Sequence, residues 1–178
     1  RKESSAASDV YKRQVLCPAR LSEQATNKAI EIALQTAEAY GQIGLLAVEL
    51  FLTHEGEVFI NEVAPRPHNS GHFSIEASYT CQFEQHIRAV LDLPLGKTES
   101  KASAVMVNLV GKEGHTGPVV YKNIDQILAI EGVTPHIYGK KETRPFRKMG
   151  HITIIHHKID TARKMAKQVK ETLSVISK

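Results

Sequence analysis

Two cysteines among 178 residues are too few for a disulfide framework. Cys17 and Cys81 are distant in the sequence and form no Cys-x-x-Cys pair, so the common zinc-binding spacing is also absent. The longest apolar run, residues 44–52, is interrupted by Glu49 and is far too short to cross a bilayer. No internal repeat or low-complexity tract is present. We therefore expect a reduced, cytoplasmic protein with one domain or two small ones and no membrane partner.

The formal net charge of +4 is unevenly distributed along the sequence. Residues 139–148 and residues 158–178 each carry +4, residues 1–14 carry +2, and the rest therefore carries −6. Nucleic-acid binding usually needs a broad basic face, so we expect no nucleic-acid partner. Short basic segments on an otherwise acidic protein fit a compact phosphate site better.

Residues 15–178 read as an α+β protein. Ser22 is a good N-cap for a helix through Ala39, and Gly41 is a plausible end for it. Alternation predicts strands over residues 45–53 and 57–63, joined as a hairpin. The other expected elements are a helix over residues 76–91, strands over 102–110, 117–121, 134–138 and 150–156, a short helix over 124–129, and a closing amphipathic helix over 161–176.

The expected domains are residues 15–98 and a β-rich region over residues 99–178. Residues 1–14 show no apolar periodicity, and we expect them to be a disordered tail. Their last six residues, 9–14, resemble the in-frame translation of a transposase end sequence used in library preparation. We therefore expect this tail to be non-native, with native sequence starting near Val15 and continuing upstream in the natural protein.

The run NEVAPRPHNSGH, residues 61–72, is the strongest candidate for a functional site. It combines a carboxylate, amides, a guanidinium, two imidazoles and a hydroxyl. Pro65 and Pro67 fix their own φ angles and bias the preceding residues toward extended backbone, so Arg66 is presented on a stiff chain. We expect this loop to bind an anion, with donors from Arg66 and His68 and orienting groups from the next two residues, Asn69 and Ser70.

Two acidic residues of the predicted hairpin belong to the same candidate site. A short hairpin loop places Glu49 opposite Glu62 or Asn61. Two neighbouring carboxylates repel each other unless a cation or proton lies between them, and carboxylates completed by phosphate oxygens suit Mg²⁺. The alternative is that Glu49 is simply solvated on an exposed face. Zinc bound by His68 and His72 is not expected, since the prolines disfavour a helix there.

A second candidate site is the basic loop over residues 140–148, between two predicted strands. Composition alone favours a solvated loop.

These residues together resemble the C-terminal half of the 5-(carboxyamino)imidazole ribonucleotide synthase family, within the ATP-grasp superfamily. The resemblance covers about Val15 to the C-terminus. The segments that carry it are residues 44–51, 61–72, 82–91, 138–142 and 147–151. The wider superfamily usually shows Glu-x-Asn-Pro-Arg, whereas here Ala64 replaces the Asn, a departure typical of this family.

The resemblance implies a ligase of purine biosynthesis that uses ATP and Mg²⁺. ATP would phosphorylate bicarbonate to carboxyphosphate, which then carboxylates the amine of 5-aminoimidazole ribonucleotide. It also implies the second lobe of an ATP-grasp domain, an antiparallel sheet with helices, followed by a small β-rich C-terminal domain, and a homodimer in the full-length protein. The implied roles are metal binding for Glu49 and Glu62, with Asn61 and Glu62 at the nucleotide; catalysis for Arg66, His68, Asn69 and Ser70; and binding of the ribonucleotide phosphate for Lys140 and Arg147, a task that Lys141, Arg144 or Lys148 could share.

The family's first ATP-grasp lobe has no counterpart here, so we expect this chain alone to be inactive. Two alternatives stay open. One is another ATP-grasp purine enzyme, the formate-dependent glycinamide ribonucleotide transformylase, against which the Pro-His-Asn-Ser-Gly-His run argues. The other is a non-catalytic dimerisation or binding module, which would form a stable dimer that does not respond to ATP.

Overall fold

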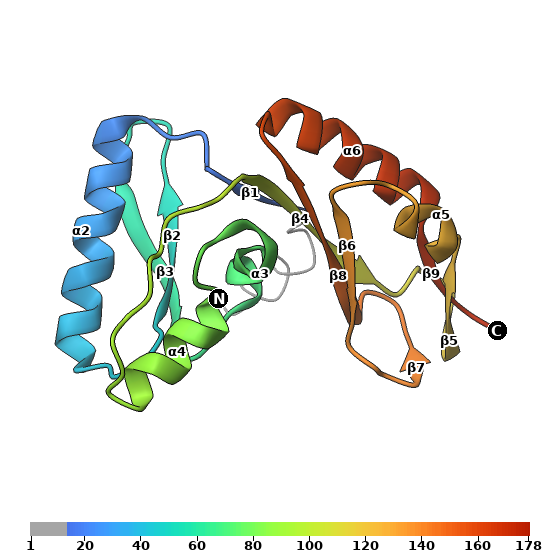
Figure 1. Cartoon of the computed structure of the whole chain (residues 1–178), viewed down its shortest axis with the longest axis horizontal. Helices are drawn as coiled ribbons and strands as arrows, with labels where there is room; N and C mark the ends of the chain where they lie inside the picture. The colour runs from blue at the N-terminus through green and yellow to red at the C-terminus, as the bar shows by residue number, and fades with distance from the viewer. Residues whose placement is uncertain (1–13) are drawn as a thin grey trace. The chain divides into compact units, whose positions relative to one another are not determined.

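The computed structural model describes residues 14–178 and divides them into two units, each of which has its own architecture (Figure 1). We call residues 19–100 the hairpin unit, and residues 14–18 with 101–178 the sheet unit. The predicted tail, apart from Gln14, lies outside the described residues. Within residues 14–178, every helix is too short or too polar to cross a membrane.

The hairpin unit packs one long helix beside a two-stranded antiparallel hairpin. Its elements are α2 (Glu23–Tyr40), β2 (Ala47–Leu52), β3 (Val58–Ala64), the 3₁₀ turn η1 (Asn69–Gly71), α3 (Ser74–Ala77) and α4 (Gln82–Val90). The predicted ends of the first helix are confirmed. The Ser22 hydroxyl accepts a hydrogen bond from the Ala25 amide at 3.2 Å, and Gly41 ends α2 in the left-handed conformation with φ 57°.

The prediction of a single helix over residues 76–91 is wrong, because α3 ends at Ala77 and α4 begins only at Gln82. The Tyr79 amide donates to the Glu99 carbonyl and the Thr80 amide to the Lys97 carbonyl, each at 3.1 Å. These bonds use backbone donors that a continuous helix would direct to its own preceding turn. Pairing with a distant segment therefore overrides the helical pattern here.

The sheet unit is built around a four-stranded antiparallel sheet in the order β1-β4-β8-β6. Its elements are β1 (Val15–Cys17), β4 (Ser103–Val110), β5 (Gly117–Lys122), α5 (Ile124–Leu128), β6 (Val133–Ile137), β7 (Glu142–Thr143), β8 (Lys148–His156), α6 (Ile159–Thr172) and β9 (Ser174–Ser177). Alternate residues of the two central strands, including Val105, Val107, Ile152 and Ile154, form a buried core with the apolar side of α6. Figure 1 shows the ribbon of α6 beside this sheet.

The predicted closing helix over residues 161–176 extends too far. In the structure α6 ends at Thr172, and residues 174–177 form β9, which pairs with β5 so that Val175 lies opposite Tyr121. Val175 and Ile176 are β-branched residues suited to a strand, and Val175 is only 3% exposed. The sheet unit therefore has a second sheet, of three strands, in the order β7-β5-β9.

The first strand also differs from the sequence-based expectation. Residues 15–17 pair with β4, so they belong to the sheet unit, whereas the predicted domain over residues 15–98 grouped them with the hairpin. Strands of two or three residues, such as β7 and β1, are too short to show an alternating pattern. Their pairing depends on the neighbouring strands.

Candidate functional site

A β-bulge in the hairpin gathers the polar side chains of the first candidate site. Glu49 of β2 pairs with Glu62 of β3, one of the two registers that the hairpin allowed, but the next residue, Leu50, pairs with Ile60. Asn61 is therefore an extra residue, and it shares with Glu62 the position opposite Glu49. Its amide Nδ2 donates to Glu49 Oε2 at 3.3 Å. Because of the bulge, both residues that were predicted as alternative neighbours of Glu49, Glu62 and Asn61, lie opposite its carboxylate.

An imidazole completes a potential cation site with these two carboxylates. Glu49, Glu62 and His68 each offer one ligand atom, and the three atoms lie within 4.8 Å of one another. His68 Nε2 is 3.6 Å from Glu49 Oε1, and these two side chains are only 14% and 13% exposed. The alternative of a solvated Glu49 is therefore wrong. The two carboxylates at this spacing fit Mg²⁺, and water and phosphate oxygens would complete its coordination.

The loop after β3 is held in place by the side chain of Gln82, the first residue of α4. Gln82 Oε1 accepts from the His68 amide at 2.9 Å, and Gln82 Nε2 donates to the His68 carbonyl at 2.8 Å. The same Nε2 lies 2.7 Å from His72 Nδ1. His68 Nδ1 in turn lies 2.9 Å from the Ser70 hydroxyl. The imidazole beside Glu49 is thus fixed through both its backbone and its ring.

Gly71 and Ser74 allow Gln82 to reach this loop. A Cβ atom on Gly71 would lie 2.6 Å from Gln82 Oε1, so only glycine leaves room for the amide. The Ser74 hydroxyl donates to the Gly71 carbonyl at 2.6 Å and accepts from the backbone N–H of Gln82 at 3.0 Å. Sequence reasoning did not assign Gln82 a role at the site. Its partner His68 is 14 residues away, and no local pattern links the two.

The other predicted residues of the loop are distributed differently. Asn69 and Ser70 are half-buried in η1, next to His68. Arg66 is exposed, and its Nη1 donates to the neighbouring Pro67 carbonyl at 3.1 Å. The structure therefore brings together Glu49, Asn61, Glu62, His68 and Ser70, and among the described contacts Arg66 is bonded only to its own loop.

The basic loop of the sheet unit forms a separate candidate site. Lys140 Nζ donates to the Lys148 carbonyl, and Arg147 Nη1 donates to the Glu142 carbonyl at 2.8 Å. Burial lowers the pKa of Lys140, and the positive charges of Arg147, Arg144 and Lys148 lower it further. Like charges held this close favour the binding of an anion, which would relieve their repulsion.

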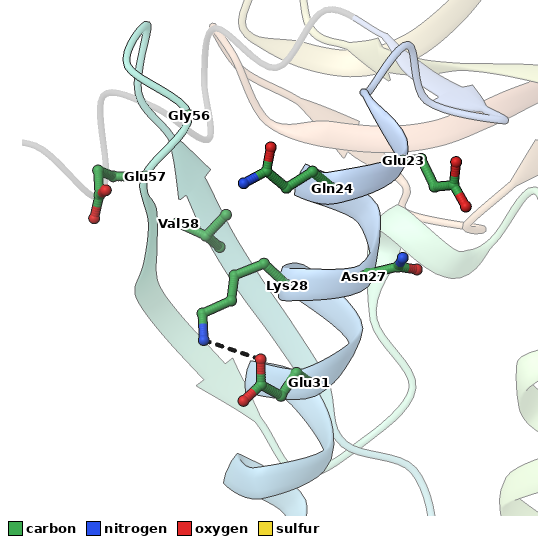
Figure 2. Close-up of a pocket in the computed structure, with 8 residues that line it drawn as sticks. All are labelled: Glu23, Gln24, Asn27, Lys28, Glu31, Gly56, Glu57 and Val58. Carbon is green, nitrogen blue, oxygen red and sulfur yellow. Dashed lines mark hydrogen bonds and ion pairs between the residues drawn. The ribbon is translucent and has the colours of Figure 1, made fainter.

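A surface hollow of the hairpin unit lies between the start of α2 and the hairpin tip, and it does not include the carboxylate cluster (Figure 2). Its residues are Glu23, Gln24, Asn27, Lys28, Glu31, Gly56, Glu57 and Val58. The one ion pair drawn there joins Lys28 Nζ and Glu31 at 2.9 Å, between side chains that are about half exposed. Such solvated charges have little effect on stability and do not form a binding site by themselves.

Two protein-family models match the sequence. The ATP-grasp domain matches residues 4–83, and the phosphoribosylaminoimidazole carboxylase C-terminal domain matches residues 104–165. Among curated relatives, the N5-carboxyaminoimidazole ribonucleotide synthase of Bacillus subtilis is 47% identical over 142 residues, covering 80% of this chain and 36% of the relative. The chloroplastic phosphoribosylaminoimidazole carboxylase of Vigna aconitifolia is 45% identical over 144 residues, covering 79% of this chain and 26% of the relative.

Solved structures show the same similarity. The N5-carboxyaminoimidazole ribonucleotide synthetase of Thermotoga maritima superposes with a TM-score of 0.90 at 50% identity, covering 93% of this chain and 46% of that chain. The Aspergillus clavatus synthase, solved with ADP and 5-aminoimidazole ribonucleotide, gives a TM-score of 0.80 at 31% identity, covering 89% and 43%. The predicted α+β fold is therefore confirmed, and this chain spans less than half of the length of these proteins.

Proposed function

We propose that this chain, which carries ATP-grasp sequence followed by a phosphoribosylaminoimidazole carboxylase C-terminal domain, is part of a ligase that carboxylates 5-aminoimidazole ribonucleotide. ATP would activate bicarbonate as carboxyphosphate, and the ribonucleotide amine would then form the C–N bond. The observation that carries this proposal is the pairing of Glu49 with Glu62 beside the proline-stiffened loop. The C-terminal family match supports this reaction over that of the formate-dependent transformylase.

Glu49 and Glu62 are the residues that we expect to hold Mg²⁺, with Asn61 bonded to Glu49 at the nucleotide side. When bound, the ion would neutralise charge on the ATP phosphates. The bulge keeps Asn61 and Glu62 facing the same carboxylate, so one short segment supplies both an amide and an acid. Structural relatives were solved with ADP and with ATP, which supports a nucleotide as a ligand of the longer protein.

His68, Asn69 and Ser70 are the expected contacts of bicarbonate or carboxyphosphate. His68 and Ser70 are already bonded to each other at 2.9 Å, so a small anion would meet two preorganised polar groups. Arg66 would have to leave the Pro67 carbonyl to join them, which an exposed side chain can do at little cost. Lys140 and Arg147 are the expected contacts of the ribonucleotide phosphate.

We further propose that the chain alone is inactive and that the longer protein is a cytoplasmic homodimer. Relatives of this chain are more than twice its length, so parts of the ATP site would come from elsewhere in such proteins. Two cysteines in 178 residues are too few for a disulfide framework, which supports a reducing compartment. Steady ADP release by the 178-residue chain, dependent on bicarbonate and the ribonucleotide, would contradict its inactivity.

Binding of Mn²⁺, as a spectroscopic substitute for Mg²⁺, tests the carboxylate site directly. Glu49→Gln and Glu62→Gln should each weaken Mn²⁺ binding by about tenfold or more, because each removes a charged oxygen ligand. Glu57→Gln is the matched control, since Glu57 is an exposed acid of the same hairpin outside the cluster. Absence of binding to the unmodified chain, or equal binding by all three variants, would refute the proposed metal site.

A further inference from the structure

Gln82 has a buried side-chain amide that contacts the backbone of one histidine of the anion-binding loop, His68, and the ring of another, His72. Its side chain is held inside the hairpin unit, with the residue only 8% exposed. It bonds to the backbone of His68 through both of its polar atoms and to the ring of His72 through Nε2. An uncharged amide buried with this many partners has an energetic reason to keep one orientation.

The backbone of His68 determines which end of the Gln82 amide is oxygen. A peptide N–H can only donate and a peptide carbonyl can only accept. The Gln82 atom at 2.9 Å from the His68 amide must therefore be the oxygen, and the atom at 2.8 Å from the His68 carbonyl must be the nitrogen. The usual ambiguity of a glutamine side chain is thus removed by two groups whose roles are fixed.

The orientation of Gln82 in turn determines the tautomer of His72. One hydrogen of the Gln82 NH₂ group goes to the His68 carbonyl, and the other points to His72 Nδ1 at 2.7 Å. His72 Nδ1 must accept that hydrogen, so the proton of the neutral ring resides on Nε2. The ring also stacks on Phe83, the next residue of α4, with centroids 5.4 Å apart, which limits its rotation.

We propose that Gln82 is a positioning residue of the ligase site: it holds the His68 imidazole beside Glu49 and fixes His72 as the Nε2–H tautomer. The inference rests on the proposed function, since it deepens the account of the same anion-binding loop. Gln82 acts only through the two histidines. Its loss would leave the two carboxylates, Glu49 and Glu62, in place and would release the loop that presents His68.

The same helix provides a matched control for this proposal. Gln85, one turn further along α4, makes an equivalent pair of hydrogen bonds to the backbone of another residue, Gly96. Its Oε1 accepts from the Gly96 amide at 2.8 Å, and its Nε2 donates to the Gly96 carbonyl at 3.0 Å. Gln85 thus anchors a loop as Gln82 does, and its hydrogen bonds in the described structure go to Gly96 and not to a histidine. Gln85→Met should reproduce the loss of anchoring but not the effect on the imidazoles.

The ¹⁵N NMR signals of the histidine rings test the proposal, because protonated and unprotonated ring nitrogens differ in chemical shift. In the unmodified chain at neutral pH, His72 should show a bare Nδ1 and a protonated Nε2. Gln82→Met should abolish this fixed pattern, and Gln82→Glu should reverse it, since a carboxylate facing Nδ1 attracts a proton there. Gln85→Met should retain the original pattern. A purely structural role predicts no reversal in Gln82→Glu.

Mn²⁺ added to the same samples tests the position of His68. The paramagnetic ion at Glu49 and Glu62 should broaden the His68 ring signals, and this broadening should be lost in Gln82→Met and retained in Gln85→Met. A His72 pattern unchanged by Gln82→Met, or the same loss in Gln85→Met, would overturn the proposal. If Mn²⁺ does not bind at all, the metal site of the proposed function fails, and the His72 signals alone decide the role of Gln82.

Discussion

The Asn61 amide and the Glu49 carboxylate lie 3.3 Å apart because β3 has one residue more than β2 at this point of the hairpin. In a regular ladder, Asn61 and Glu62 would point to opposite faces. The bulge removes this alternation locally, so a neutral donor and a second acid both face Glu49. The arrangement gives Glu49 a neutral donor and a like charge, in addition to the His68 imidazole 3.6 Å away.

Replacing this amide by an acid should exchange stability for metal affinity. Asn61→Asp adds a third carboxylate next to Glu49, so like-charge repulsion should lower the melting temperature without metal. The added oxygen ligand should strengthen Mn²⁺ binding and make the stabilisation by Mn²⁺ larger. Thermal unfolding with and without Mn²⁺ measures both effects. Asn27→Asp, at an exposed position of α2, makes the same charge change and should have neither effect.

Removing the Ser74 hydroxyl should destabilise the hairpin unit. This buried hydroxyl bonds to the Gly71 carbonyl and to the backbone N–H of Gln82, and Ser74→Ala leaves both groups without that partner. We expect a loss of about 1–3 kcal/mol in the free energy of unfolding, measured by urea denaturation. Thr26→Ala removes an exposed hydroxyl that bonds to the Ser22 carbonyl, and its effect should stay within about 0.5 kcal/mol. Equal losses in the two variants would contradict this account.

A methyl group at Gly71 should displace Gln82. Gly71→Ala places a Cβ atom 2.6 Å from Gln82 Oε1, and such overpacking typically costs about 1–3 kcal/mol. The ¹⁵N pattern of His72 should change together with stability. Gly41→Ala should also cost about 1 kcal/mol, because Gly41 has φ 57°, but it should leave His72 unchanged. A His72 pattern that is unaffected by Gly71→Ala would show that the amide tolerates the added methyl group.

Lys140 should make stability increase with pH in the alkaline range. Its pKa is lowered in the folded state, first by burial and then by Arg147, Arg144 and Lys148. Between this lowered pKa and the ordinary value for lysine, the unfolded chain binds more protons than the folded one, so the free energy of unfolding rises with pH in that window. Below the window, the charged Lys140 opposes folding.

Removing a neighbouring charge should move this titration in a known direction. Arg147→Gln should raise the pKa of Lys140, and bound inorganic phosphate should raise it as well, since an anion favours the charged ammonium. Lysine side-chain NMR across an alkaline pH series measures the pKa. Arg163→Gln, on α6 outside the basic loop, serves as the control and should leave Lys140 unchanged. A lower pKa in Arg147→Gln would refute the electrostatic explanation.

Much of the candidate site followed from signals that are local in the sequence. The polar composition of residues 61–72 and its two prolines identified the loop, and the spacing of two strands around a short turn placed Glu49 opposite Glu62 or Asn61. The two residues that cap the first helix, Ser22 and Gly41, were also predicted from the sequence. Each of these features depends on φ preferences, side-chain chemistry or short-range hydrogen bonds within a few residues.

Features that depend on distant partners emerged only in three dimensions. The break between α3 and α4 arises from bonds to residues 97 and 99, and β9 exists because β5 offers it a partner. The bulge at Asn61 and the contact of Gln82 with His68 likewise depend on how separate segments meet. Local chemistry thus specified which groups this protein brings to its site. Long-range hydrogen bonding and packing, which no short window of sequence encodes, specified how those groups are oriented.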